Sequence, residues 1–255
     1  MITVSIITVA YNAEFQIEKT IQSVINQISD YKIEYIIIDG DSRDNTLNII
    51  NKYKIHINYL LSEKDEGIYD AMNKAIIKCR GHYLYFLNAG DILLPDVFNS
   101  LKDPINSNYD IIYGHVKVGD NNDIWKCKNI ETILYDMPFS HQAVLVKRSI
   151  MTKYNFNTKY KIAADYNLFL NLYLENYIFY KTDTIFSLYD TNGISNSSSI
   201  VTIIEYLKVL KISAKMFDKL IWPIAYLYKK RSFLIYLMLE KFNLLNFGRK
   251  FKRLF

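Results

Sequence analysis

The chain has 255 residues, half of them apolar, with unexceptional amounts of glycine, proline and charge, so it can bury a full core in one large domain or in one domain with an appendage. Its two cysteines, Cys79 and Cys127, exclude a disulfide framework and a cysteine-based zinc site, and they favour a reducing compartment. The net charge of +5 is unevenly spread: residues 215–255 hold 10 Lys or Arg and 2 Asp or Glu, a net of +8, which leaves a net of −3 for the rest. A mildly acidic body with a basic tail suggests separate tasks for the two parts.

In the first hundred residues, short apolar runs alternate with amphipathic stretches. The runs predict strands buried on both faces, and the stretches predict helices. The expected strands are Val4–Ala10, Glu34–Asp39, Ile57–Leu61 and Tyr83–Leu87; the expected helices have an apolar face from Ile17 to Ile28 or cover Thr46–Tyr53 and Ile68–Cys79. This alternation predicts an α/β fold with a mostly parallel central sheet, flanking helices and right-handed crossovers.

The regular alternation of apolar runs and amphipathic stretches ends after residue 100. Strands are expected at Asp110–Val118, Ala143–Val146 and Ile178–Ser187, a helix at Asp165–Glu175, a loop at Tyr189–Ser199, and helices over residues 200–255. The first residues, MITVSIITVAYN, lack the basic stretch and the small-residue cleavage site of a signal peptide. We therefore expect a cytoplasmic protein.

Polar residues follow the end of each of the first four strands: Tyr11-Asn12, Asp39-Gly40-Asp41, Ser62–Asp65 and Asn88–Asp91. In open α/β sheets, ligands bind outside the carboxyl ends of the strands, so we expect these corners to share one site. The turn after the first strand, Ala10–Glu14, contains no glycine, and the chain has no Walker A loop. These absences exclude the usual nicotinamide and P-loop nucleotide sites.

Four segments carry a more specific signal in their order and spacing: VSIITVAYN, IIIDGDSRDNT, DEGIYDAMNKAI and YFLNAGD. Together they resemble the family-2 glycosyltransferases of the GT-A fold over about residues 1–195. The resemblance implies a nucleotide-sugar donor, a divalent metal, Mg²⁺ or Mn²⁺, and inversion at the anomeric carbon. It also implies a GT-A domain over residues 1–199, with a nucleotide half (1–100) and an acceptor half (101–199), followed by a basic amphipathic helical region at 200–255.

The nucleotide must be held by its base and its phosphates. A carboxylate can accept the N–H of a uracil ring, and the aspartate that ends the second strand has this role in the family, which points to Asp39 and favours UDP over other nucleotides. For Asp65, Gly67, Asn73 and Lys74, the alternative is a capped amphipathic helix with Lys74 and Asp70 exposed. The resemblance implies donor contacts at Thr8, Tyr11, Asn12, Asp39, Asp41, Asp65, Gly67, Asn73, Lys74, Asn88, Ala89 and Gly90.

The diphosphate leaving group is expected to need a metal ion acting as a Lewis acid. The family pattern at the fourth corner is an aspartate-rich D-x-D-D, whereas this chain has Asn88-Ala89-Gly90-Asp91. Asp91 is therefore the expected metal ligand, because hard cations prefer carboxylate oxygens and keep several waters. The alternative is that Asp91 only caps the following turn.

Inverting transfer also needs a general base for the acceptor hydroxyl. The resemblance places it at the start of a late helix, which here is Asp165; the alternative is a plain N-terminal helix cap. His141 and Gln142, just before an apolar strand, are expected to contact acceptor or donor sugar. The Ser/Asn-rich loop at residues 192–199 is expected either to close over the donor or to be a linker.

Residues 215–255 mix aromatic and aliphatic side chains with Lys and Arg. The apolar runs are too short to span a bilayer, so we expect an interfacial helix pair on the inner face of the membrane, near a lipid-linked glycan acceptor. This fits enzymes of capsule, lipopolysaccharide or other polysaccharide synthesis. A helical appendage or a dimer contact is the alternative, and no nucleic-acid partner is expected.

Two rival functions compete with sugar transfer. The strand-ending IIIDGDS has the spacing of an aspartyl phosphatase, but the first strand of the chain carries no carboxylate. A non-catalytic sugar-nucleotide-binding protein would explain the reduced aspartate cluster, but it would not need a base at Asp165. The sequence therefore predicts a metal-dependent inverting glycosyltransferase.

Overall fold

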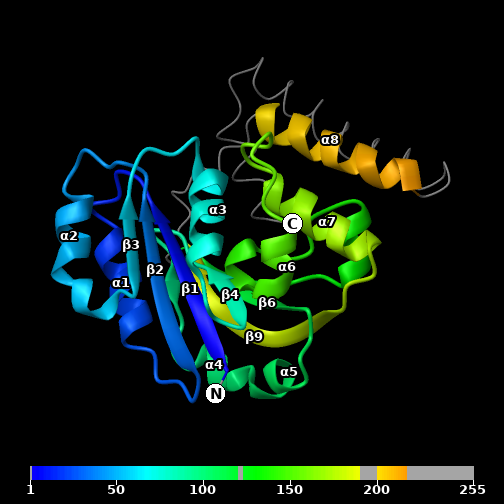
Figure 1. The fold of residues 1–255 in the computed structure, drawn as a ribbon. Coiled ribbons are helices and arrows are strands. Elements are labelled where there is room, and N and C mark those ends of the chain that lie inside the picture. The colour runs from blue at the N-terminus through cyan, green and yellow to red at the C-terminus, as the bar shows by residue number, and fades with distance from the viewer. Residues whose placement is uncertain (1, 120–122, 190–199, 217–255) are drawn as a thin grey trace. The chain divides into compact units, whose positions relative to one another are not determined.

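The computed structural model describes residues 2–119, 123–189 and 200–216. The chain divides into two compact units, residues 1–196 and 197–255, and each is described by itself. In the first unit, the described strands form one curved sheet in the order β3-β2-β1-β4-β8-β6-β9-β5, with β7 paired to β6 (Figure 1). The strands are β1 Thr3–Ala10, β2 Lys32–Asp39, β3 Tyr59–Ser62, β4 Tyr83–Phe86, β5 Ile92–Leu93, β6 Ile111–Val118, β7 Asp123–Trp125, β8 Val144–Lys147 and β9 Phe179–Tyr189.

The helices of the first unit are α1 Ile17–Ile25, α2 Thr46–Lys52, α3 Ile68–Lys78, α4 Val97–Ser100, α5 Lys102–Asn106, α6 Arg148–Lys153 and α7 Ala164–Leu174, with 3₁₀ turns at η1 Lys54–His56, η2 Ile130–Leu134 and η3 His141–Ala143. Helices α1 and α2 cover one face of the β3-β2-β1-β4 half, and α3 covers the other (Figure 1). This arrangement follows from right-handed crossovers, because the chain moves outward from β1 to β3 and then returns across the sheet to β4.

The half that begins the chain is parallel, as its sequence predicts. β1 pairs in parallel with β2 and β4, and β2 pairs in parallel with β3. The predicted bounds of these four strands agree with the structure to within two residues at each end. β1, β2 and β4 are short β-branched or aromatic runs, and Ile6, Ile37 and Tyr85 at their centres are completely buried. β3, at the edge of the sheet, is only half-buried, so the predicted burial on both faces is wrong for this strand.

The second half of the sheet is mixed. β8 is antiparallel to both β4 and β6, β6 is parallel to β9, and β5 is antiparallel to β9. The short elements β5, β7 and α4 to α6 are absent from the sequence prediction. The two residues of β5 pair with Leu188 and Ser187, so a contact far away in the chain determines this strand rather than its own pattern.

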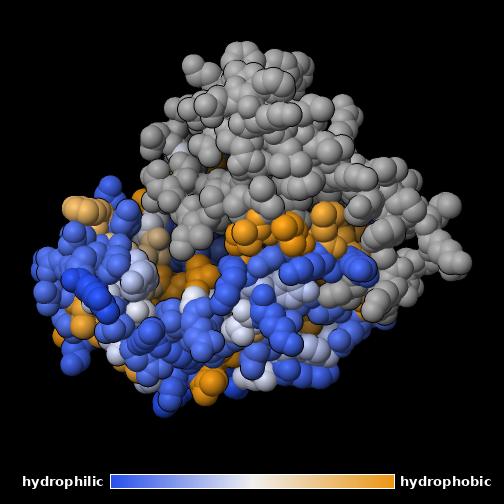
Figure 2. Space-filling model, turned by 90° about the horizontal axis from the view of Figure 1, so that it is seen from above, coloured by the Kyte–Doolittle hydropathy of each residue, from blue (hydrophilic) through white to orange (hydrophobic). Residues whose placement is uncertain are grey.

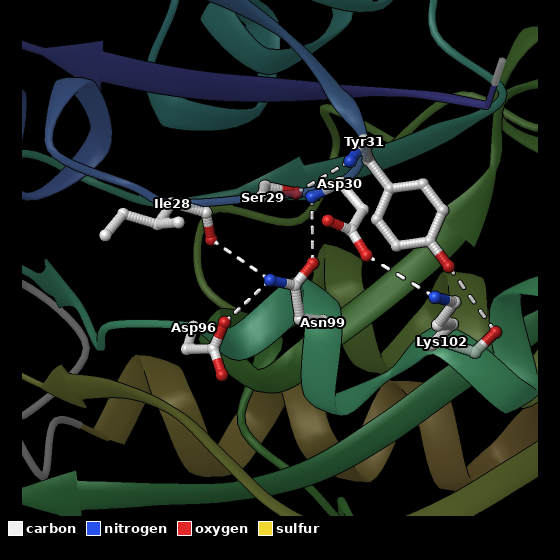
Figure 3. A network of polar contacts seen from close by, with 7 residues as sticks. All are labelled: Ile28, Ser29, Asp30, Tyr31, Asp96, Asn99 and Lys102. Carbon is white, nitrogen blue, oxygen red and sulfur yellow. Dashed lines mark hydrogen bonds and ion pairs between the residues drawn. The ribbon is translucent and has the colours of Figure 1, made fainter.

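The first helix is shorter than the sequence predicts. Ile17, Ile21 and Val24 are buried, but α1 ends at Ile25 and Ile28 is 81 % exposed. The chain leaves the helix because the loop before β2 is held by α4, where Asn99 accepts a hydrogen bond from the Asp30 N–H at 2.9 Å. The full network consists of Ile28, Ser29, Asp30, Tyr31, Asp96, Asn99 and Lys102 (Figure 3). It fixes the entry into β2 at the edge of the sheet opposite the carboxyl ends of the parallel strands.

The second unit contains one described helix, α8 Ile200–Met216. The predicted loop begins at Tyr189, which is instead the last residue of β9; the rest of that loop, residues 190–199, and most of the basic region, residues 217–255, lie outside the described residues. Among the helices that are described, none combines the length and the apolar character that a membrane span requires.

Candidate active site

A cavity of about 380 Å³ lies at the carboxyl edge of the sheet, where β1 and β4 are adjacent although β2 and β3 separate them in the chain. Such a topological switch point is where open α/β sheets bind ligands. Figure 2 looks onto this edge from above: the described residues there are mostly hydrophilic, with apolar groups between them. The lining includes Tyr11, Asn12, Gln16, Asp65, Gly67, Tyr69, Asn88, Ala89, Asp91, His141, Gln142, Lys161, Ile162, Asp165 and Tyr189.

The corner after β4 is held by α1. Thr20, which is fully buried, accepts the Gly90 N–H at 3.0 Å and donates to the Asp91 carbonyl at 2.8 Å. Gly90 has a φ of 107°, which side-chain-bearing residues rarely adopt. An aspartate at position 90, as in the D-x-D-D pattern, would be strained in this backbone. The corner therefore presents Asp91, which is only 3 % exposed, as its single carboxylate.

The donor atoms at this corner fit a hard divalent cation with few protein ligands. Asp91 lines the cavity, and beside it the buried Asn88 Oδ1 has no hydrogen-bond partner in the described part of the chain. Carboxylate and amide oxygens are ligands that Mg²⁺ and Mn²⁺ accept. The described residues contain no group of three or more His, Cys, Asp or Glu suited to hold a metal, so phosphate and water oxygens would have to complete the coordination.

A second carboxylate enters the cavity from α7. Asp165 is in the first turn of this helix, where a negative charge is favourable, and its Oδ1 accepts the Tyr166 N–H at 2.7 Å. The Tyr69 hydroxyl, from α3, lies 3.2 Å from the same oxygen and donates to the Ile162 carbonyl at 2.6 Å. Tyr69 therefore ties the start of α7 to α3.

His141 lies between the two carboxylate regions. Its Nε2 is 3.0 Å from Asn88 Nδ2, and its Nδ1 is 3.8 Å from Asp165 Oδ2. Burial lowers the pKa of His141 to about 4, so the ring is neutral at physiological pH and forms no ion pair with Asp165. With the Asn88 amide donating to Nε2, the imidazole proton is on Nδ1, the atom that faces Asp165.

Ten of the predicted site residues line this cavity: Tyr11, Asn12, Asp65, Gly67, Asn88, Ala89, Asp91, His141, Gln142 and Asp165. The other predicted site residues are not part of its lining. Thr8 is buried against the Tyr35 hydroxyl, and Gly90 bonds Thr20. Asp39 is fully buried, and Asp41 is exposed with a left-handed φ of 64°.

Asn73 and Lys74 also lie outside the cavity lining. The Asn73 amide makes two 2.9 Å hydrogen bonds to the backbone of Phe156. The Lys74 ammonium contacts the Lys64 carbonyl, Glu63 and Asp70 at 2.9 to 3.3 Å. These contacts brace α3 and the loop before it.

Sequence reasoning missed Gln16, Tyr69, Lys161, Ile162 and Tyr189 as lining residues. Tyr69 belongs to the segment DEGIYDAMNKAI, so its helical position two residues after Gly67 could have drawn attention to it. Nothing in the sequence around Lys161 indicates that this residue lines the cavity. Its ammonium donates to the Glu66 carbonyl at 3.2 Å, across 95 residues of chain.

Comparison with known proteins decides the family. A model of glycosyl transferase family 2 matches residues 5–169. The chain belongs to glycosyltransferase family 2. It is 27 % identical over 206 residues to the PGL/p-HBAD biosynthesis glycosyltransferase of Mycobacterium bovis (strain BCG / Pasteur 1173P2), covering 74 % of this chain and 79 % of that protein. The predicted enzyme class, a glycosyltransferase, is confirmed.

Solved structures confirm the fold. TarS 1-349 of S. aureus in complex with UDP-GlcNAc superposes with a TM-score of 0.69 at 18 % identity, covering 86 % of this chain and 68 % of that one. Mannosyltransferase PcManGT from Pyrobaculum calidifontis, in complex with GDP-Man and Mn²⁺, superposes with a TM-score of 0.62 at 17 % identity, covering 88 % and 68 %. The mostly parallel GT-A architecture predicted from the sequence is therefore correct.

Proposed function

We propose that this glycosyltransferase moves a sugar, with inversion, from a nucleotide sugar to a glycan or a lipid-linked glycan. UDP is the nucleotide favoured for the donor. One observation supports this most strongly: a single cavity at the switch point is lined both by Asp91 with Asn88 and by Asp165. The first pair suits a metal-bound diphosphate, and the second carboxylate suits a general base. The UDP-GlcNAc complex of TarS supports a UDP-sugar donor.

Asp165 is the proposed general base. It would take the proton from the acceptor hydroxyl as that oxygen attacks the anomeric carbon, and the sugar–phosphate bond would break on the opposite face. The Tyr166 N–H holds its Oδ1, the Tyr69 hydroxyl lies 3.2 Å from the same oxygen, and Oδ2 is on the side of His141. His141 and Gln142 are proposed to contact donor or acceptor sugar.

Asp91 is the proposed metal ligand, with the Asn88 amide oxygen beside it. A bound Mg²⁺ or Mn²⁺ would supply Lewis-acid stabilisation of the leaving diphosphate. Tyr11, Asn12, Asp65, Gly67 and Ala89 line the same cavity and are proposed donor contacts. Thr8, Asn73, Lys74 and Gly90 lie outside the lining and would hold those contacts in place, whereas the exposed Asp41 stays a proposed donor contact.

The acceptor and the cellular location rest on the sequence alone. The basic composition of residues 215–255 supports a peripheral place on the cytoplasmic face of the membrane, beside a lipid-linked acceptor. That association, a role in capsule or lipopolysaccharide synthesis, and the oligomeric state stay predictions.

A panel of nucleotide sugars tests the proposed function. Purified enzyme with Mn²⁺ is expected to hydrolyse at least one UDP-sugar slowly and to bind it more tightly than ADP- or CDP-sugars. Calorimetry and release of UDP measure the two properties. Absence of both binding and release for every UDP- and GDP-sugar in the panel would refute the proposal.

The Tyr69 hydroxyl is expected to matter for the chemical step rather than for donor binding. Tyr69→Phe keeps the ring that packs on Phe156, with centroids 5.3 Å apart, but frees the start of α7. We expect kcat to fall roughly 10-fold while the donor KM changes less than about twofold. Tyr166→Phe is the matched control, because its hydroxyl bonds the Ile133 carbonyl at 2.8 Å. Equal losses in both variants would show that Tyr69 has only a structural role.

A further inference from the structure

The turn η3, which carries His141, is fixed to the sheet through one backbone carbonyl. The Gln142 carbonyl accepts the Tyr85 hydroxyl at 2.7 Å and the Ser187 hydroxyl at 3.0 Å, and both hydrogen bonds are buried. Tyr85 belongs to β4 and Ser187 to β9, so two strands from distant parts of the chain hold the turn. His141, the first residue of η3, therefore enters the cavity from a backbone that is held in place.

The ring of His141 bridges two parts of the site that are far apart in the chain. Asn88, at the corner after β4, has its amide nitrogen 3.0 Å from Nε2 of the ring. Because an amide nitrogen can only donate, Nε2 accepts this hydrogen bond, and the proton of the neutral ring is on Nδ1. Nδ1 is 3.8 Å from Oδ2 of Asp165 in α7, so the N–H of the ring is on the side of that carboxylate.

Two other histidines have the opposite arrangement. Nδ1 of His82 accepts the Thr3 N–H at 3.1 Å, and Nδ1 of His115 accepts the Cys127 N–H at 3.2 Å. The proton of each of these rings, when neutral, is therefore on Nε2. Of the three rings, only that of His141 has its proton on Nδ1, and it owes this tautomer to its neighbour in the site.

The carboxylate of a general base needs a fixed orientation, because one of its oxygens must meet the acceptor hydroxyl. The Tyr166 N–H binds Oδ1 of Asp165, and an N–H group beside Oδ2 fixes the plane of the carboxylate. Each oxygen of an ionised carboxylate can accept two hydrogen bonds, so Oδ2 can still receive the acceptor proton. The distance of 3.8 Å exceeds that of a hydrogen bond, but catalytic hydrogen bonds are often long before the substrate binds and shorten in the complex.

We propose that His141 is a positioning residue for the general base: its Nδ1–H orients the Asp165 carboxylate, and Asn88 keeps the proton on Nδ1. The inference rests on the proposed function, because Asp165 is a base only in that reaction. It gives Asn88 a task besides its place at the metal corner. An ionised aspartate, as in the D-x-D-D pattern, has no N–H and could not perform this task.

Two substitutions of His141 separate its two nitrogens. In His141→Asn the amide is near the position of Nδ1 and can still donate to Asp165, whereas in His141→Gln the amide reaches the position of Nε2 and keeps only the contact with Asn88. With the UDP-sugar that the donor panel selects and Mn²⁺, kcat for UDP release should fall roughly 10- to 100-fold in His141→Gln. His141→Asn should recover at least about 10-fold over His141→Gln, and the donor KM should change less than about threefold in both variants.

A double variant tests whether His141 acts through Asp165. If it does, adding His141→Gln to Asp165→Asn should lower kcat by no more than about twofold further, because the group that His141 positions is already lost. Losses that multiply would show that His141 acts on the reaction independently, and would overturn the inference.

His115→Gln is the matched control for these variants. His115 is also a buried histidine, with 8 % of its surface exposed, and it lies outside the cavity lining. UDP release should therefore be unaffected in His115→Gln. Thermal melting of every variant confirms that it is folded.

The position of the proton can be measured without substrate or metal. The chain has four histidines, so nitrogen NMR of the full chain with isotope-labelled histidine resolves few rings, and the spectrum of His141→Gln identifies the signals of His141. At a pH well above the ordinary histidine pKa, His141 should be in the Nδ1–H form, and His82 and His115 in the Nε2–H form. In Asn88→Ala, the share of the Nδ1–H form of His141 should fall. An Nε2–H form in the wild type, or an unchanged tautomer in Asn88→Ala, would overturn the inference.

The outcomes separate this inference from the function on which it rests. A wild type that neither binds nor hydrolyses any nucleotide sugar would overturn the proposed function and the inference together. An active wild type with His141→Asn as slow as His141→Gln would overturn the inference alone. A loss confined to the donor KM would do the same, since it would show that His141 only binds the sugar.

Discussion

Replacing Asp165 with asparagine is expected to lower kcat by roughly 10²–10⁴-fold, the usual contribution of a general base. Asparagine keeps the size of the side chain and can still accept the Tyr166 N–H, so the start of α7 should persist. The carboxamide cannot take up the acceptor proton. Because the donor contacts lie at other strand ends, the affinity for UDP should stay within about twofold of the wild-type value.

Asp103→Asn is a closely matched control. Asp103 is the second residue of α5, as Asp165 is the second residue of α7, so both changes remove a negative charge from the first turn of a helix. Asp103 is exposed and lies outside the cavity lining. Steady-state transfer should therefore be unaffected in Asp103→Asn. Turnover in Asp165→Asn within a few-fold of the wild type would show that the base is another residue.

The parallel half of the sheet could be predicted because each of its strands is identified by its own residues. β1, β2 and β4 are buried on both faces, so their apolar runs stand out against polar corners. The edge of the second half depends on distant partners. The pair Ile92–Leu93 continues an apolar stretch that reads equally well as a turn, and it becomes β5 because Leu188 and Ser187 of β9 offer it partners.

The site was predictable to the extent that it depends on strand ends. Parallel strands bring their carboxyl ends to one edge, so Tyr11, Asp65 and Asp91 could be placed together from the sequence. The register between strands was not accessible. The pairing of Asp39 with Ser62 buries a carboxylate that a strand-end argument leaves open, and the approach of Tyr69 to Asp165 joins the starts of two helices that are far apart in the chain.

Replacing Asp91 with asparagine is expected to remove the metal dependence of donor binding. The Asp91 backbone contacts to Thr20 and Asn88 remain, so the corner should keep its shape while it loses its only carboxylate. We expect the Mn²⁺ concentration that half-saturates UDP-sugar binding to rise about 10-fold or more. Titration of Mn²⁺ at fixed UDP-sugar, followed by calorimetry, measures this change.

Asn88→Asp is the reciprocal variant, because it supplies a second carboxylate at the corner without altering the backbone of Gly90. Added negative charge beside Asp91 should tighten Mn²⁺ binding and lower the half-saturating concentration, since carboxylates are stronger ligands for hard cations than amides. The two variants should therefore move the metal dependence in opposite directions. If donor binding by the wild type is the same with and without a chelator, Asp91 is not a metal ligand. The positive charge near the diphosphate must then come from the protein, and Lys161, which lines the cavity, is the candidate side chain.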